Sequence, residues 1–214
     1  MTSIPGAVVF DMDGVLVDSG VHHREAWIAM CRDCGVTPPA EFWRLTIGRP
    51  AEEAVVLLVD GIGAAEARRL ADLKRGHYER LARRGLMAVA GAAEFVKTLM
   101  RDGVPRAVAT SASRRDLERV LDALGLREHI DVAVTADDVR HGKPHPEVYL
   151  KAARGLGVDA AACMVFEDAI VGVQAARAAG MRVIGITTAH TAAELCSAGA
   201  ERALAHFEGV RWPV

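Results

Sequence analysis

The sequence predicts an α/β fold: a doubly wound, Rossmann-like parallel sheet with a small helical cap domain inserted after the first strand. Short apolar runs alternate with helical patterns along most of the chain, and one long interval lacks such runs. The chain has 214 residues, of which 51% are hydrophobic, so it is long enough to bury a core and to carry an accessory unit.

The first predicted strand is the apolar run Ala7–Phe10, which ends in Asp-Met-Asp-Gly. A fully buried parallel strand reads as a continuous apolar run and presents polar residues at its carboxyl end. Four similar runs follow, at Ala107–Ala109, Val132–Val134, Met164–Phe166 and Val183–Ile186.

Helical patterns separate these runs. One predicted apolar face combines Phe95, Val96, Leu99 and Met100, and a second combines Leu117, Val120, Leu121 and Leu124. The second helix is expected to begin with Ser113 and Asp116 as an N-terminal box and to stop at Gly125.

The interval from Val17 to Met87 breaks the alternation, because it shows helix-like stretches and no convincing buried strand. These stretches lie around Ala26–Cys34, Glu52–Val59 and Ala64–Arg84. We therefore expect a core domain of residues 1–16 and 88–214 and a cap domain of residues 17–87. Loops at the carboxyl ends of parallel strands carry ligands, so the cap is expected to form a lid over the site.

Composition narrows the class of partner. The net charge is −2, and no basic tract or acidic tail indicates nucleic acid or anionic lipid. The run Ala7–Phe10 is too short for a signal-peptide core or a membrane span. We expect a soluble, cytoplasmic protein, a monomer or weak homodimer, that acts on a small molecule and has no nucleic acid or membrane partner.

The cysteines do not form the dense framework of a small secreted domain, so reduced thiols are expected. Cys31 and Cys34 have the spacing of a redox pair or half a zinc site, but they lie inside a helical pattern and lack a second such pair. We interpret them as structural.

Two carboxylates follow the first predicted strand. Asp11 and Asp13 are two residues apart, so in extended backbone both side chains project to the same side, where they need a cation or a shared proton. Gly14 lets the chain turn away. An isolated Asp-x-Asp-Gly is also compatible with an ordinary polar turn, whereas the further ligands of an EF-hand are missing.

Polar residues also follow later strands. Ser111 comes after Ala107–Ala109, Glu167 and Asp168 come at the end of Met164–Phe166, and Lys143 precedes a helix expected near Pro146. Each alone could be a capping residue or a solvated charge. Together they place four carboxylates, a hydroxyl and a lysine at one edge of the sheet.

This set suits phosphoryl transfer. Carboxylates and water hold Mg²⁺, which also binds a phosphate oxygen, while a hydroxyl and an ammonium hold the other oxygens. A carboxylate can then attack phosphorus, and a second aspartate can protonate the leaving group and later deprotonate water.

The ordered motifs resemble the haloacid dehalogenase (HAD) superfamily, in particular its phosphatase and β-phosphoglucomutase branch. They span nearly the whole chain: Asp11–Ser19, Ala109–Ser111, Gly142–Pro144, and Phe166–Ala169 followed by Gly172 and Ala178–Gly180. The resemblance implies that the Val17–Met87 insertion is the helical cap.

The resemblance also implies residue roles. Asp11 would be the nucleophile and a metal ligand, and Asp13 the acid/base and a metal ligand through its backbone oxygen. Ser111 and Lys143 would bind phosphate, and Asp168, assisted by Glu167, would bind Mg²⁺. An aspartate at position 13 indicates phosphate-ester chemistry, because the dehalogenases themselves lack this acid/base.

Three cap residues are expected to contact substrate. His23 falls on the family's histidine, and Lys74 falls near a cap lysine of the mutase. Arg49 lies in Gly48-Arg49-Pro50, which departs from the mutase pattern and looks more like the loop of phosphatases. All three residues could instead belong to ordinary polar helix faces.

We therefore predict a phosphatase that acts on a small phosphorylated metabolite, a sugar or polyol phosphate, through an aspartyl-phosphate intermediate. The alternative within enzymology is a phosphosugar mutase of the β-phosphoglucomutase type. The non-enzymatic alternative is a receiver-like signalling module, which needs no helical insertion and has no acidic pair after its lysine.

Overall fold

The computed structural model describes residues 5–59 and 61–214 and contains one six-stranded sheet in which every pairing is parallel. The strand order is β3-β2-β1-β4-β5-β6. The strands are β1 (Ala7–Phe10), β2 (Arg106–Ala109), β3 (Val132–Val134), β4 (Cys163–Glu167), β5 (Arg182–Ile186) and β6 (Arg202–Leu204). This order confirms the doubly wound α/β prediction and places a switch point between β1 and β4.

All five predicted strands form where the apolar runs indicated, and β6 was not predicted. Alternate residues of β1 pack on opposite faces of the sheet: Val8 and Phe10 in one core cluster, Ala7 and Val9 in the other. Because helices cover both faces, a strand with both sides buried must be apolar throughout. This explains why the strands appear in the sequence as continuous apolar runs and not as alternating apolar and polar residues.

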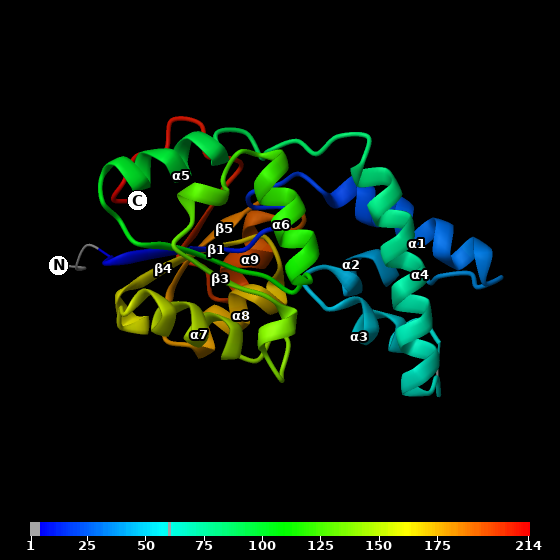
Figure 1. Cartoon of the computed structure of the whole chain (residues 1–214). Coiled ribbons are helices and arrows are strands. Elements are labelled where there is room, and N and C mark those ends of the chain that lie inside the picture. Colours follow the sequence, from blue (N-terminus) through cyan, green and yellow to red (C-terminus); the bar gives the residue numbers. More distant parts are fainter. Residues whose placement is uncertain (1–4, 60) are drawn as a thin grey trace.

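Helices cover the two faces of the sheet in separate groups (Figure 1). One group is α5 (Ala92–Arg101) and α6 (Arg114–Ala123), and the other is α7 (Glu147–Leu156), α8 (Ile170–Ala178) and α9 (Ala192–Ala198). Three single-turn helices precede strands or helices: η1 (Arg127–His129), η2 (Ala136–Asp138) and η3 (Ala160–Ala162).

The expected start of α6 is confirmed, because Ser113 Oγ accepts a hydrogen bond from the backbone N–H of Asp116. The assignment of Met100 to the apolar face of α5 was wrong, since its side chain is 45% exposed. Each helical residue is rotated by about 100° from the last, which turns Met100 away from Leu99 and the buried face.

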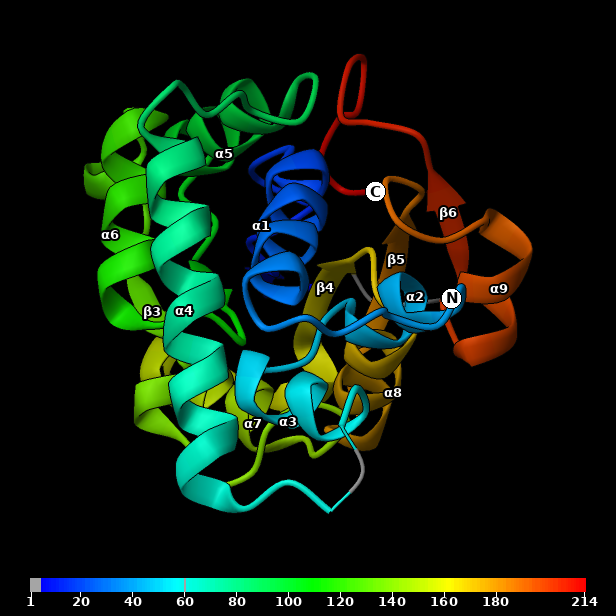
Figure 2. The same cartoon turned by 90° about the vertical axis from the view of Figure 1, so that its right-hand side faces the viewer.

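Four further helices lie beyond the carboxyl ends of the strands (Figures 1 and 2). They are α1 (Gly20–Asp33), α2 (Phe42–Thr46), α3 (Ala51–Val56) and α4 (Ala64–Ala82). Helices were expected at the positions of α1, α3 and α4, and α2 was not predicted. No strand of the sheet falls between Val17 and Met87 in the part of the chain that the structure describes.

These four helices share a small apolar core of their own, built on Trp27, Met30, Phe42, Val55 and Leu70. Cys31 is buried in the same core, as expected for a structural residue.

Two linkers that run side by side connect α1–α4 to the sheet. The N–H of Asp18 donates to Met87 O (2.8 Å), and the N–H of Val89 donates to Leu16 O (3.1 Å). No helix among the described residues has the length and apolar character needed to span a lipid bilayer.

Candidate active site

Asp11 directly follows β1, and its carboxylate meets a buried lysine. Lys143 Nζ donates to Asp11 Oδ1 (2.6 Å), to Glu167 Oε1 (2.7 Å) and to the carbonyl oxygen of Ala109 (3.2 Å). Lys143 is only 1% exposed, so water does not screen these contacts. The lysine thus joins the carboxyl ends of β1, β2 and β4.

Glu167 is fully buried and is held on both oxygens. Tyr149 Oη donates to Oε1 (2.8 Å), and the N–H of Ala169 donates to Oε2 (2.8 Å). A Cβ on Gly172 would lie 1.7 Å from Oε1, so a residue without a side chain is required there. These contacts fix Glu167 as the partner that positions Lys143.

Asp168 faces the turn that follows β1. Thr188 Oγ1 donates to Gly14 O (2.6 Å) and lies 3.1 Å from Asp168 Oδ2, while His190 Nδ1 lies 2.9 Å from Asp168 O. Gly14 has φ +76°, and a Cβ there would lie 1.9 Å from Asp168 Oδ2. Gly14 therefore provides both the turn and the space for this carboxylate.

Asp11, Glu167 and Asp168 form a buried acidic cluster whose carboxylate oxygens lie within 4.8 Å of one another. Burial raises the pKa of Asp11 to about 7 although Lys143 opposes the rise, and burial with the charge of Glu167 raises the pKa of Asp168 well above its usual range. Lys143 contacts two of the three carboxylates and offsets part of their charge. An all-oxygen cluster with excess negative charge fits a hard cation such as Mg²⁺.

Asp13 points away from this cluster toward α1. Its Oδ1 accepts hydrogen bonds from Ser19 Oγ (2.6 Å) and His23 Nε2 (3.0 Å). The second ring nitrogen of His23, Nδ1, lies 2.7 Å from Lys74 Nζ. A chain of hydrogen bonds therefore runs from the end of β1 through α1 to α4.

The electrostatics of this chain assign its donors. Burial and the charge of Lys74 lower the pKa of His23, which favours a neutral imidazole. Lys74 then donates to Nδ1, and the Nε2–H donates to the Asp13 carboxylate. Burial also lowers the pKa of Lys74 to about 8 although Asp13 opposes this. Burial raises the pKa of Asp13, but the interactions with His23, Ser19 and Lys74 lower it by more.

Seven of the nine predicted site residues, from both parts of the chain, line one cavity of about 430 Å³. That volume suits a small organic ligand. The sheet contributes Asp11, Asp13, Ser111 and Asp168, and the helical insertion contributes His23, Arg49 and Lys74. Lys143 and Glu167 do not line this cavity. Glu167 is fully buried, and Lys143 lines a second cavity of about 190 Å³ that shares Thr110 and Ser111 with the first.

Ser111 bridges the two parts of the chain, since its Oγ donates to the carbonyl oxygen of Gly48 (2.9 Å). Gly48 has φ +74°, and a Cβ there would lie 2.6 Å from the Cβ of Ala169. The loop with Arg49 therefore packs directly against the end of β4.

Aromatic rings support the basic side chains of the cavity. Lys74 Nζ lies 5.2 Å from the ring centre of Trp27 and 5.3 Å from that of Tyr78, which stacks on His23 at 4.2 Å. Arg24 lies over Trp43 at 5.9 Å. Such cation–π contacts favour a charged head while an apolar wall excludes water.

Sequence reasoning missed several of these residues. Thr188 closely follows the end of β5, so the strand-end rule that found Ser111 could have found it. Tyr149 lies inside α7 and reaches Glu167 only through the tertiary fold. Nothing local in the sequence distinguishes it from an ordinary core tyrosine.

A family model described as haloacid dehalogenase-like hydrolase matches residues 5–180. The protein belongs to this family. The validoxylamine A 7'-phosphate phosphatase of Streptomyces hygroscopicus subsp. limoneus is 37% identical over 205 residues, which cover 96% of this chain and 95% of the relative. The phosphorylated carbohydrates phosphatase of Thermotoga maritima is 33% identical and covers 84% of each chain.

Solved structures agree on the fold of this HAD-like hydrolase. A point mutant of CbbY from Rhodobacter sphaeroides, solved with xylulose-(1,5)bisphosphate, superposes with a TM-score of 0.82 at 28% identity and 96% coverage of both chains. A β-phosphoglucomutase from Clostridium difficile superposes with a TM-score of 0.86, covering 98% of this chain and 94% of its own, and at 22% identity it supports the fold alone.

Proposed function

We propose that this HAD-like hydrolase is a Mg²⁺-dependent phosphatase of a small phosphorylated metabolite, with a sugar or polyol phosphate as its substrate. The observation that carries the proposal is the pairing of Asp11 with buried Lys143 at the switch point, beside a second aspartate linked to the cap. Support for the substrate class comes from the two curated relatives named above, both phosphatases that cover most of this chain.

In the proposed reaction Asp11 attacks phosphorus and forms an aspartyl phosphate, and water then releases inorganic phosphate. Lys143 holds a phosphoryl oxygen and reduces the repulsion between the two anions, and Ser111 holds another oxygen. Asp13 protonates the leaving oxygen and later takes a proton from water. Its carboxylate is oriented for this role by Ser19 and His23.

Asp11, Asp168 and the backbone oxygen of Asp13 would hold Mg²⁺, and Glu167 completes the charge of the acidic cluster. The ion would supply charge neutralisation at the phosphoryl oxygens and at the attacking carboxylate.

We also propose that residues 17–87 act as the cap domain and residues 1–16 and 88–214 as the core, although residues 1–4 lie outside the described part. Support comes from the separate apolar core of α1–α4 and from the two paired linkers. Arg49, Lys74 and His23 would then read the part of the substrate that is distant from phosphorus.

The competing function is a phosphosugar mutase, which would return the phosphoryl group to the sugar instead of to water. Support for this alternative comes from solved structures of similar fold from Bacteroides vulgatus and Thermotoga maritima, at 27% and 30% identity, both described as putative β-phosphoglucomutases. Membership of a hydrolase family and the presence of α1–α4 argue against the receiver-like module. We also propose that the enzyme is cytoplasmic and that it is a monomer or a weak homodimer. We propose no nucleic acid partner.

A panel of phosphorylated sugars, polyols and glycolate with Mg²⁺ tests the proposal, with phosphate release as the readout and Asp11→Asn as the matched control. We expect the wild type to release phosphate from a sugar or polyol phosphate and the variant to release none. A second assay uses glucose 1-phosphate with a trace of bisphosphorylated primer. If glucose 6-phosphate is the main product, the enzyme is a phosphosugar mutase and the phosphatase proposal is wrong.

A further inference from the structure

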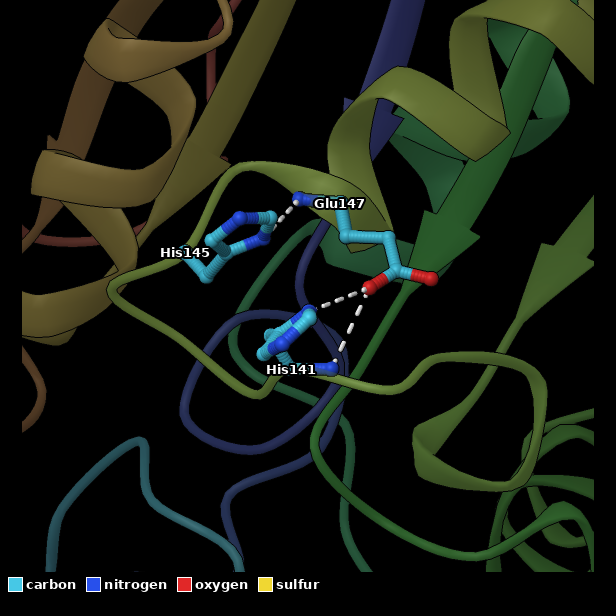
Figure 3. A group of neighbouring side chains, drawn as sticks. All are labelled: His141, His145 and Glu147. Atoms are coloured by element: carbon cyan, nitrogen blue, oxygen red, sulfur yellow. Dashed lines mark hydrogen bonds and ion pairs between the residues drawn. The ribbon is translucent and has the colours of Figure 1, made fainter.

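A second group of potential metal ligands lies outside the active-site cavity. His141 and His145 lie on the loop between η2 and α7, and Glu147 begins α7. Figure 3 shows both imidazole rings and the carboxylate gathered on one side of this loop. Both histidines are exposed, so an ion can reach them from solvent.

The distances within this group suit a metal ion. One ligand atom from each residue lies within 4.8 Å of the other two, and His141 Nδ1 is 3.2 Å from Glu147 Oε2. Zinc–ligand bonds of about 2.0–2.1 Å place two ligands of a tetrahedral ion roughly 3.3 Å apart. The ring centres of the two histidines are 4.6 Å apart, so both rings lie within reach of one ion.

Contacts within the chain position the carboxylate of Glu147 before any ion binds. Glu147 accepts hydrogen bonds from the backbone N–H groups of Arg140 (3.2 Å) and His141 (3.1 Å), and Lys151 Nζ lies 3.1 Å from Oε1. Lys151 pairs with Oε1, which leaves Oε2 facing His141.

The contacts that an ion would replace are long. His141 Nδ1 lies 3.2 Å from the carboxylate, and the N–H of Glu147 lies 3.3 Å from His145 Nδ1. Both distances lie at or beyond the long end of protein hydrogen bonds. Replacing these two long hydrogen bonds by metal–ligand bonds therefore costs little binding free energy.

We propose that His141, His145 and Glu147 form a surface site for a divalent transition-metal ion of the Zn²⁺ type, distinct from the acidic cluster of the active site. Imidazole nitrogen suits zinc, nickel and copper, whereas Mg²⁺ prefers carboxylate and water oxygens. Two histidines and one carboxylate leave open coordination positions toward solvent. The acidic cluster is therefore expected to prefer Mg²⁺, and the site of two histidines and a glutamate is expected to prefer Zn²⁺.

The site has a structural consequence for the active site. His141 and His145 flank Lys143 at two residues on either side, so an ion bound to both ties down the segment that carries the buried lysine. Opening of this segment exposes the N–H groups of Arg140 and His141, and a bound ion makes that opening rarer.

Zinc binding to the full chain, measured by equilibrium dialysis with Mg²⁺ in large excess, tests the proposal. The excess Mg²⁺ competes for the acidic cluster and leaves the histidine site free for Zn²⁺. We expect one tight Zn²⁺ in the wild type and at least a tenfold weaker affinity after joint replacement of His141 and His145 by Ala. Glu147→Gln keeps an acceptor for the backbone and should also weaken Zn²⁺ binding.

His206→Ala is the matched control, because His206 is an exposed histidine that pairs with Glu208 at 3.9 Å in a different part of the chain. It should bind Zn²⁺ like the wild type. Zn²⁺ should also slow amide hydrogen exchange at Arg140 and His141 in the wild type and not in the double variant. Equal Zn²⁺ affinity in the wild type and the double variant would show that the proposed zinc site is wrong. This result does not depend on which substrate the enzyme uses.

Discussion

Replacing Asp11 by Asn should remove activity and yet stabilise the metal-free protein at neutral and alkaline pH. Asp11 is 7% exposed, and burial raises its pKa from 3.8 to about 7. The folded state therefore binds a proton more tightly than the unfolded state, and this contribution to stability is present below pH 3.8 and lost as the pH rises toward 7. An asparagine at position 11 stays neutral at every pH, so the variant does not lose this stability as the pH rises.

The magnitude follows from the two pKa values. Each pKa unit corresponds to about 1.4 kcal/mol, so the full effect is roughly 4 kcal/mol in the free energy of unfolding. The advantage of Asp11→Asn over the wild type should grow from about 1–2 kcal/mol at pH 5 to roughly 4 kcal/mol at pH 8. At about 2–4 °C per kcal/mol for a chain of this size, the melting temperature should differ by roughly 10 °C at pH 8.

Denaturant unfolding of both proteins in chelator at pH 5 and pH 8 measures this difference directly. Adding Mg²⁺ should narrow it, because the ion favours the ionised carboxylate that only the wild type has. A variant less stable than the wild type at pH 8, or a difference that does not change with pH, would refute the reasoning about the buried cluster.

Three further predictions concern catalysis. Ser111→Ala and Lys143→Ala should lower turnover of every substrate together by at least tenfold, because we propose that both hold oxygens of the phosphoryl group that all substrates share. A loss confined to one substrate would argue against this role. His23→Ala, Arg49→Ala and Lys74→Ala should change discrimination among sugar phosphates more than turnover of a small aromatic phosphate. Equal losses on both kinds of substrate would contradict the proposal that these residues recognise the substrate. Activity should disappear in chelator and return with Mg²⁺, whereas Ca²⁺ should inhibit because its longer bonds misplace Asp11; full activity after metal removal would exclude the metal's role.

The sheet could be predicted because its central strands have both faces buried and must be apolar throughout. Strand β6 (Arg202–Leu204) escaped because it lies at the edge, pairs with β5 alone and begins with an exposed arginine. Helix α2 (Phe42–Thr46) escaped because five residues after two prolines carry little helical signal. Its stability comes from burying Phe42 in the core of α1–α4.

The strand-end residues could be predicted for a topological reason. Parallel strands present their carboxyl ends at one edge, so Asp11, Ser111 and Asp168 meet although they are distant in sequence. Contacts that depend on tertiary packing were not accessible to the same argument. Tyr149 meets Glu167, and Lys74 meets His23 across 51 positions, through side chains whose direction no local pattern specifies.

Trapping the covalent intermediate is the most direct test of the central claim. Enzyme turning over a phosphorylated substrate with Mg²⁺ is quenched in acid, digested and analysed by mass spectrometry for phosphorylated peptides. The account predicts one phosphoryl group on Asp11, absent from Asp11→Asn. Phosphate release by the wild type without phosphorylation of Asp11, or release at an undiminished rate by Asp11→Asn, would contradict it.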